Sequence, residues 1–147
     1  MTTASQKNIA GLPGVLAETF RLYVQTHRCH WNVEGPSFRQ LHVLFEAQYQ
    51  NLWNALDGIA ERIRTQGAYA PGSVADLMAL AGPEDRAAPS APEMMIKLIT
   101  GHEALATTLQ AAIASSSDAN DEVSAGMLTD RLEWHEKELW MMKTSSR

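Results

Sequence analysis

Cysteine is nearly absent from this chain: Cys29 is alone among 147 residues, so no disulfide can form within it. That usage is typical of a reducing compartment. Long apolar runs are absent too, since none approaches the ~18 residues that a membrane span needs. The first residues are polar and lack the apolar segment of a signal peptide. We therefore expect a cytoplasmic protein, with the nucleoid included in that location.

Positive charge and aromatic residues are also scarce. The formal net charge is −5 and aromatic residues make up 7% of the chain, which argues against a protein that binds nucleic acid by simple charge attraction. The HExxH, CxxC and P-loop patterns do not occur, so zinc-protease, thiol-redox and nucleotide chemistry have no support.

What the sequence does contain is apolar residues at helical spacing in four long segments, without the alternation of strands. The predicted helices span approximately residues 13–32, 37–66, 90–114 and 121–143. The only long linker, 68–91, is rich in Pro and Gly, and Ser73–Ala81 predicts a short helix within it. Residues 115–120 predict a polar break. The sequence thus predicts an all-α four-helix bundle with a long crossover between helices 2 and 3, the ferritin-like connection. It occupies residues 12–147 after a short polar tail, 1–11.

The second predicted helix carries two stripes. Its apolar ridge is made by Leu41, Phe45, Leu52, Leu56, Ile59 and Ile63. Beside this ridge, at ~100° per residue, lie His42, Glu46, Asp57 and Glu61. Their spacing is a palindrome, so an identical antiparallel helix would set His42 against Glu61 and Glu46 against Asp57. A closed two-fold contact repeats every interaction, which predicts two equivalent sites per dimer.

Two interpretations of the second stripe remain open at this point. Four ionisable residues on a helix face are typical of a solvated face with pairs one turn apart, whereas the mirror spacing favours metal ligands. Imidazole with carboxylate suits Fe(II) or Zn(II). A bundle-interior di-iron site would need Glu-x-x-His pairs, and none of the five histidines has Glu three places before it. A metal site here is therefore expected between subunits.

Several short motifs together resemble the Dps mini-ferritins. They are His30-Trp31-Asn32 with Gly35-Pro36, Leu41-His42, Leu44-Phe45-Glu46, Asp57 with Ala60-Glu61-Arg62, and, near the end, Leu128-Thr129, His135-Glu136-Lys137 and Trp140. The resemblance extends over the whole chain. It implies a hollow dodecamer built from two-fold dimers, and iron held by His30, His42 and Glu46 of one subunit with Asp57 and Glu61 of its neighbour. Most family members have Asp where Glu46 stands, which affects the second iron position.

The resemblance also implies a reaction. We expect a ferroxidase that oxidises Fe(II) with hydrogen peroxide and stores Fe(III) mineral, with Trp31 intercepting oxidising equivalents. The alternative is a structural or DNA-protecting shell without redox turnover. DNA binding is expected to be weak or absent, because the terminal segments offer only Lys7, Lys143 and Arg147 as basic residues.

For the remaining candidates the structural interpretation is preferred. His102 and His135 are expected to be hydrogen-bonded core histidines, His27 a partly exposed surface histidine, and Cys29 a small buried residue. The other tryptophans, Trp53, Trp134 and Trp140, are expected to be core or interface anchors. Asp118, Asp121 and Glu122 are equally well interpreted as part of an acidic pore or as helix N-terminal acids.

Overall fold

The computed structural model describes residues 9, 11–81 and 90–146. This part of the chain contains five helices: α2 (Leu12–Asn32), α3 (Phe38–Thr65), α4 (Val74–Ala81), α5 (Ala91–Asp118) and α6 (Glu122–Ser145). Among the described residues, no helix is both long enough and apolar enough to cross a membrane. The predicted tail, except Ile9 and Gly11, and residues 82–89 of the crossover lie outside the described residues.

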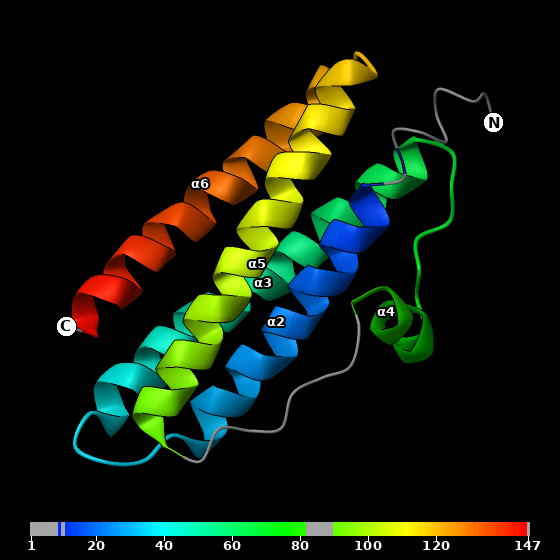
Figure 1. Cartoon of the computed structure of the whole chain (residues 1–147). Helices are drawn as coiled ribbons and strands as arrows, with labels where there is room; N and C mark the ends of the chain where they lie inside the picture. Colours follow the sequence, from blue (N-terminus) through cyan, green and yellow to red (C-terminus); the bar gives the residue numbers. More distant parts are fainter. Residues whose placement is uncertain (1–8, 10, 82–89, 147) are drawn as a thin grey trace.

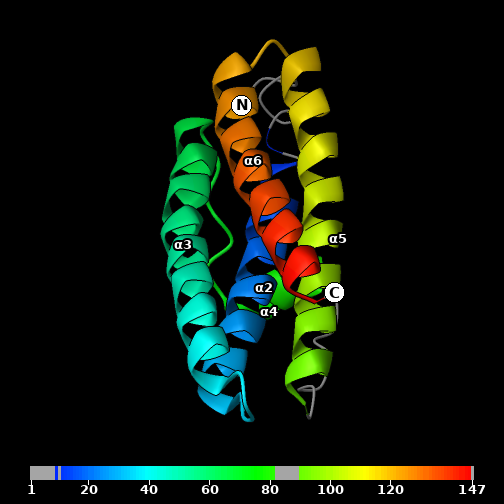
Figure 2. The same cartoon turned by 90° about the vertical axis from the view of Figure 1, so that its left-hand side faces the viewer.

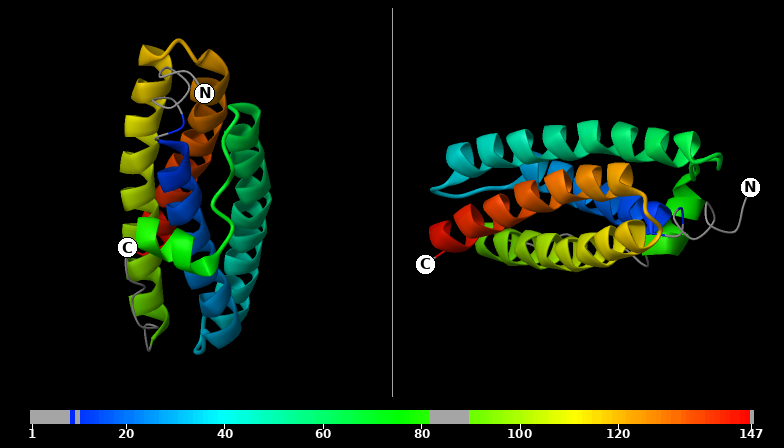
Figure 3. Two further views of the ribbon diagram at one scale, coloured as in Figure 1. Left: turned by 90° about the vertical axis from the view of Figure 1, so that its right-hand side faces the viewer. Right: turned by 90° about the horizontal axis from the view of Figure 1, so that it is seen from above.

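The four long helices lie side by side as two antiparallel hairpins, α2 with α3 and α5 with α6 (Figure 1). Helix α2 also packs against α5, which joins the two hairpins. The short helix α4 lies across the outside of α2, as the view in Figure 2 and the left panel of Figure 3 show. The predicted four-helix bundle with a helix inside the crossover is therefore confirmed.

Most helix ends follow local signals in the sequence. The Ser90 hydroxyl accepts a hydrogen bond from the backbone N–H of Glu93 at the start of α5, and the Ser73 hydroxyl does the same for Asp76 at the start of α4. Helix α3 ends before Gly67, whose φ of +89° is a conformation that glycine adopts without strain.

Ser37 is the N-cap of α3, in agreement with the predicted start at 37, although its side chain makes no capping hydrogen bond. The backbone N–H groups of Phe38 and Leu41 donate to the carbonyls of Gly35 and Ser37. One predicted boundary was wrong. The expected break at 115–120 is shorter, because α5 continues to Asp118. The chain turns at Asn120, a non-glycine residue with a φ of +60°; Asn is one of the few residues that tolerates this conformation.

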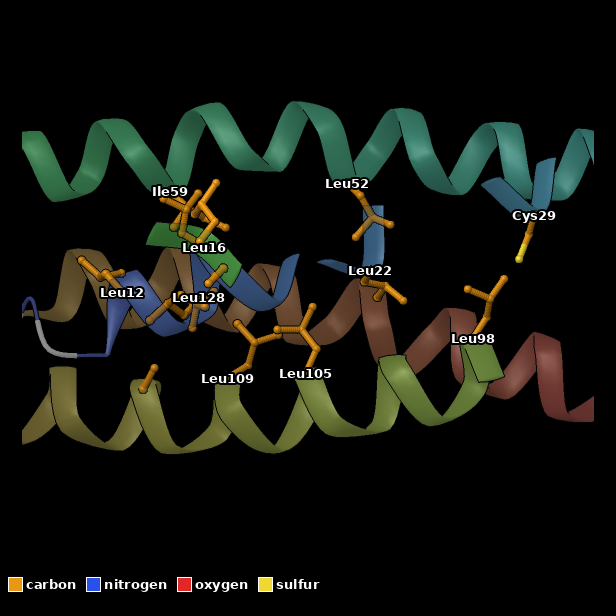
Figure 4. Packing of buried hydrophobic residues seen from close by; sticks show 14 of the residues in the cluster. Leu12, Leu16, Leu22, Cys29, Leu52, Ile59, Leu98, Leu105, Leu109 and Leu128 are labelled. Carbon is orange, nitrogen blue, oxygen red and sulfur yellow. The ribbon is translucent and has the colours of Figure 1, made fainter. Parts of the chain in front are cut away.

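The core lies along the inner faces of α2, α3, α5 and α6 (Figure 4). Phe45, Leu52, Ile59 and Ile63 of the predicted α3 ridge are fully buried, while Leu41 and Leu56 are partly buried at its edge. Ile9, at the end of the predicted polar tail, is also buried in this core. Helix α3 is therefore fixed in rotation, and its second stripe faces sideways, away from the bundle centre.

Side-chain hydrogen bonds and an ion pair join α3 to α6 and its N-cap. Gln48 donates a hydrogen bond to Glu138, Arg131 donates one to Asn51, and Arg62 pairs with Asp121. These bonds connect the site-bearing hairpin to the second hairpin in a fixed register.

Candidate metal centre

His30, near the end of α2, and His42, in the second turn of α3, hold each other by reciprocal hydrogen bonds. Nδ1 of each ring lies 2.7 Å from the backbone carbonyl oxygen of the other residue. The rings stack with centroids 3.8 Å apart and planes 15° from parallel. We call this arrangement the histidine clasp.

The clasp determines which ring nitrogens can bind a metal. A carbonyl oxygen only accepts, so each Nδ1 must carry the proton. Each Nε2 then carries a lone pair, which is the form that ligates a metal ion, and the bond at Nδ1 fixes the ring orientation. Two preoriented imidazole donors are thus present in the chain before any metal binds. Glu46 is half-buried one turn after His42 on the same helix.

Asp57 and Glu61 form a second group, one turn apart on the exposed face of α3. Hydrogen bonding with Asp57, followed by the negative charge of Asp57, raises the pKa of Glu61. Two neighbouring carboxylates repel each other, and a cation between them would relieve this repulsion. Asp57 also lines a groove of about 660 Å³ between α2, α3 and α4.

One chain does not bring these two groups together. Asp57 lies fifteen residues after His42 on one straight helix, which is roughly 22 Å at 1.5 Å per residue. Within the described residues, no three His, Cys, Asp or Glu side chains come close enough to hold a metal ion. The chain therefore presents a nitrogen-rich half-site and a carboxylate half-site at separate positions along α3.

Trp31, predicted beside the iron centre, is 65% exposed and lies against His27, with ring centroids 4.0 Å apart. His27 is partly exposed, as expected, and it also has partners: it stacks on Tyr49 at 3.8 Å, and its Nδ1 lies 3.0 Å from the Tyr23 hydroxyl. Burial lowers the pKa of His27, and His30 lowers it further. The i, i+4 spacing of Tyr23 and His27 on a predicted helix is the sequence signal for this pair.

The two core histidines are confirmed. His102 and His135 are fully buried, with Nδ1 atoms 2.8 Å apart. Arg131 approaches Nε2 of His135 at 3.4 Å, and because a guanidinium only donates, this nitrogen accepts. His135 therefore donates from Nδ1 to His102. The Arg131 cation would repel a metal ion at the bundle centre, so this pair is unsuited to metal binding.

Cys29 is buried as expected, and burial raises its thiol pKa to about 11, so it is a poor nucleophile and a poor metal ligand. Trp53 and Trp140, expected as core or interface anchors, are 57% and 64% exposed in the single chain, which excludes a core position. Trp134 is partly buried against the core.

Asp121 has a capping role. Its carboxylate accepts hydrogen bonds from the backbone N–H and the hydroxyl of Ser124 and pairs with Arg62 at 2.7 Å. These partners occupy the carboxylate, so the helix-terminal interpretation is the one the structure supports for Asp121. Glu122 and Asp118 are exposed.

Asp121→Ala is expected to lower the free energy of unfolding by about 2 kcal/mol, because it removes an N-cap and the ion pair with Arg62, which retains its hydrogen bond to Ser124. Asp121→Asn keeps the cap and should lose less than half as much. Denaturant unfolding of both variants measures the difference. Equal losses would show that the charge, rather than the cap, dominates.

The fold and the clasp define a ferritin-like protein, and comparison agrees: residues 9–145 match the ferritin family model, described as a ferritin-like domain. The DNA protection during starvation protein of Brevibacillus brevis is 32% identical over 97% of both chains. A Dps crystal structure from Bacillus brevis has a TM-score of 0.95 and 30% identity, covering 100% of this chain and 99% of its own. The chain belongs to the Dps family of ferritin-like proteins.

A further relative widens the comparison. The crystal structure of the Dps protein of Vibrio cholerae O1, described as a member of a broad superfamily of ferritin-like diiron-carboxylate proteins, has a TM-score of 0.94 and 28% identity. It covers 99% of this chain and 92% of its own. Membership of this family fits a protein that stores iron.

Proposed function

We propose that this chain is a ferroxidase that binds Fe(II) between two subunits, oxidises it with hydrogen peroxide and retains the Fe(III) as mineral inside a hollow dodecamer. The observation that carries the proposal is the histidine clasp, which leaves both Nε2 lone pairs of His30 and His42 available. The tautomer that the clasp fixes is the one that presents Nε2 to a metal ion.

The partner that completes the site is a second copy of the chain. The mirror spacing of His42, Glu46, Asp57 and Glu61 brings the nitrogen half-site of one copy to the carboxylate half-site of the other when the two α3 helices run antiparallel. The apolar groove beside Asp57 and the exposed ring of Trp53 provide a surface for such a contact. Each dimer then has two sites, with Glu46 as a further ligand.

Iron is the substrate in this scheme. Fe(II) accepts both imidazole and carboxylate ligands, and the neighbouring carboxylates of Asp57 and Glu61 supply two oxygen ligands from one turn of α3. One peroxide takes up two electrons and two protons to give two waters, so it oxidises two Fe(II). The few protein ligands leave coordination positions open for the oxidant.

A second candidate, protection of DNA by a shell without redox turnover, is favoured by the names of relatives such as the Brevibacillus protein. The net charge of −5 opposes direct binding to phosphate.

One experiment on the unmodified protein separates the two. Light scattering is expected to give twelve times the mass of the chain, and stopped-flow mixing with Fe(II) should show rapid oxidation at two Fe(II) per peroxide, slower with dioxygen. The iron should then co-elute with the protein. Assembly with oxidation no faster than in buffer would favour the inert shell.

A further inference from the structure

Tyr23 and His27 form a hydrogen-bonded pair one turn apart on α2. The Tyr23 hydroxyl oxygen lies 3.0 Å from Nδ1 of His27. A phenol is the stronger acid of two neutral partners and an imidazole the stronger base, so Tyr23 donates and Nδ1 accepts. Burial raises the pKa of Tyr23, which keeps its proton on the phenol at neutral pH.

Ring contacts connect this pair to the histidine clasp. His27 lies between Trp31, at 4.0 Å, and Tyr49, at 3.8 Å with planes 9° from parallel. The Tyr49 ring in turn meets His30 edge-on at 5.1 Å. Rings in van der Waals contact allow an electron to pass between them without large movements of the protein.

Tyr23 is the only one of the three tyrosines with a hydrogen-bonded base among the described residues. Tyr69 is 88% exposed with the Arg64 guanidinium 4.4 Å from its ring centroid, and a cation opposes the loss of an electron. Tyr49 contacts His27, as Tyr23 does, and also His30, yet within the described part of the chain its hydroxyl has no hydrogen-bonded acceptor. Loss of an electron makes a phenol strongly acidic, so a base in place lowers the barrier.

We propose that Tyr23, with His27 as its proton acceptor, supplies one electron to the oxidant when the site holds a single Fe(II). This rests on the proposed function. Peroxide needs two electrons, and one Fe(II) gives only one. One peroxide, one Fe(II), the Tyr23–His27 pair and two protons from solvent give Fe(III), two waters, a Tyr23 phenoxyl radical and a His27 imidazolium. The O–O bond breaks, the phenol proton moves to Nδ1, and no hydroxyl radical is released.

The test uses the assembled protein loaded with one Fe(II) per site and mixed with peroxide. Electron paramagnetic resonance of freeze-quenched samples should show an organic radical whose signal narrows when the tyrosine rings are deuterated. Tyr23→Phe, which keeps the ring and removes the hydroxyl, should lose this signal and release hydroxyl radical to a spin trap. Tyr49→Phe and Tyr69→Phe are matched controls and should keep it.

The role of His27 has a separate readout. A one-electron oxidant generated by a light flash in the metal-free protein should oxidise Tyr23 rapidly, and His27→Phe, which retains a stacking ring, should slow this step by roughly 10²-fold. An unchanged rate would overturn the role of His27. Circular dichroism and light scattering would verify that each variant folds and assembles.

Two outcomes are distinguishable in the iron experiment. Rapid Fe(II) oxidation with no tyrosine radical, or with a radical that survives Tyr23→Phe, overturns this inference and leaves the ferroxidase intact. Fe(II) that stays unoxidised in the unmodified protein overturns both.

Discussion

Replacing His30 and His42 together by Ala is expected to abolish the rapid oxidation of Fe(II) by peroxide. Both Nε2 donors disappear, and the carboxylates Asp57 and Glu61 alone bind Fe(II) weakly. Stopped-flow absorbance would measure the loss against the unmodified protein. Oxidation at an unchanged rate would refute the assignment of these two histidines.

Mixing two inactive variants tests whether the site lies between subunits. A second variant, Asp57→Asn with Glu61→Gln, should be equally inactive. In a dimer containing one copy of each variant, one site loses all four side chains and the other keeps all four. Random reassembly of equal amounts should therefore restore about a quarter of the sites, from two-fold symmetry alone.

The mixture also controls for misfolding. The recovered activity can come only from variants that fold and associate, because each is inactive alone. If the four residues served a site within a single chain, no mixture would recover activity, and the antiparallel dimer would have to be abandoned.

Acid is expected to destabilise the bundle through its two core histidines. Burial, together with the Arg131 cation, lowers the pKa of His102 to about 4. Burial, followed by His102 and Arg131, lowers the pKa of His135 to about 2. The unfolded chain therefore takes up protons below about pH 6.5 that the folded chain does not. Unfolding free energy falls as the pH falls through this window, and the His102 shift corresponds to about 3 kcal/mol at pH 4.

Denaturant midpoints between about pH 7 and pH 4 would test this in the unmodified protein and in His102→Leu with His135→Leu. The variant should lose much less stability on acidification, because leucine does not titrate. Carboxylates titrate in both proteins and cancel in the comparison. Parallel curves would show that other groups control the acid response.

The helices could be predicted from the sequence because each has apolar residues at helical spacing and recognisable residues at its ends. Ser90, Gly67 and the linker around Pro71 and Gly72 are local features. The extension of α5 past Ser115 was missed because Ser116 is buried against the bundle, and burial can outweigh weak helix propensity.

The contacts that join distant segments could not be predicted in the same way. The burial of His102 and His135 follows from their periodic positions, whereas the approach of Arg131 to Asn51 depends on the register between α6 and α3. The clasp depends on the turn that contains Gly35, which has a φ of +106°. The ligand assignment from Asp57 and Glu61 of a neighbouring chain remains a prediction.

The structural role of the histidine clasp affects how metal binding can be inferred for related sequences. The carbonyl of His30 is among the last of α2, where no following turn offers a backbone donor, and the His42 imidazole satisfies it. If the site binds iron as proposed, a relative that no longer binds iron would still gain from keeping both histidines, because the His42 side chain satisfies a carbonyl at the end of α2. Asp57 and Glu61 are exposed and lie outside the core, so they have no comparable structural role in the chain. The presence or absence of these two carboxylates in a relative is therefore a better indicator of metal binding than the presence of the two histidines.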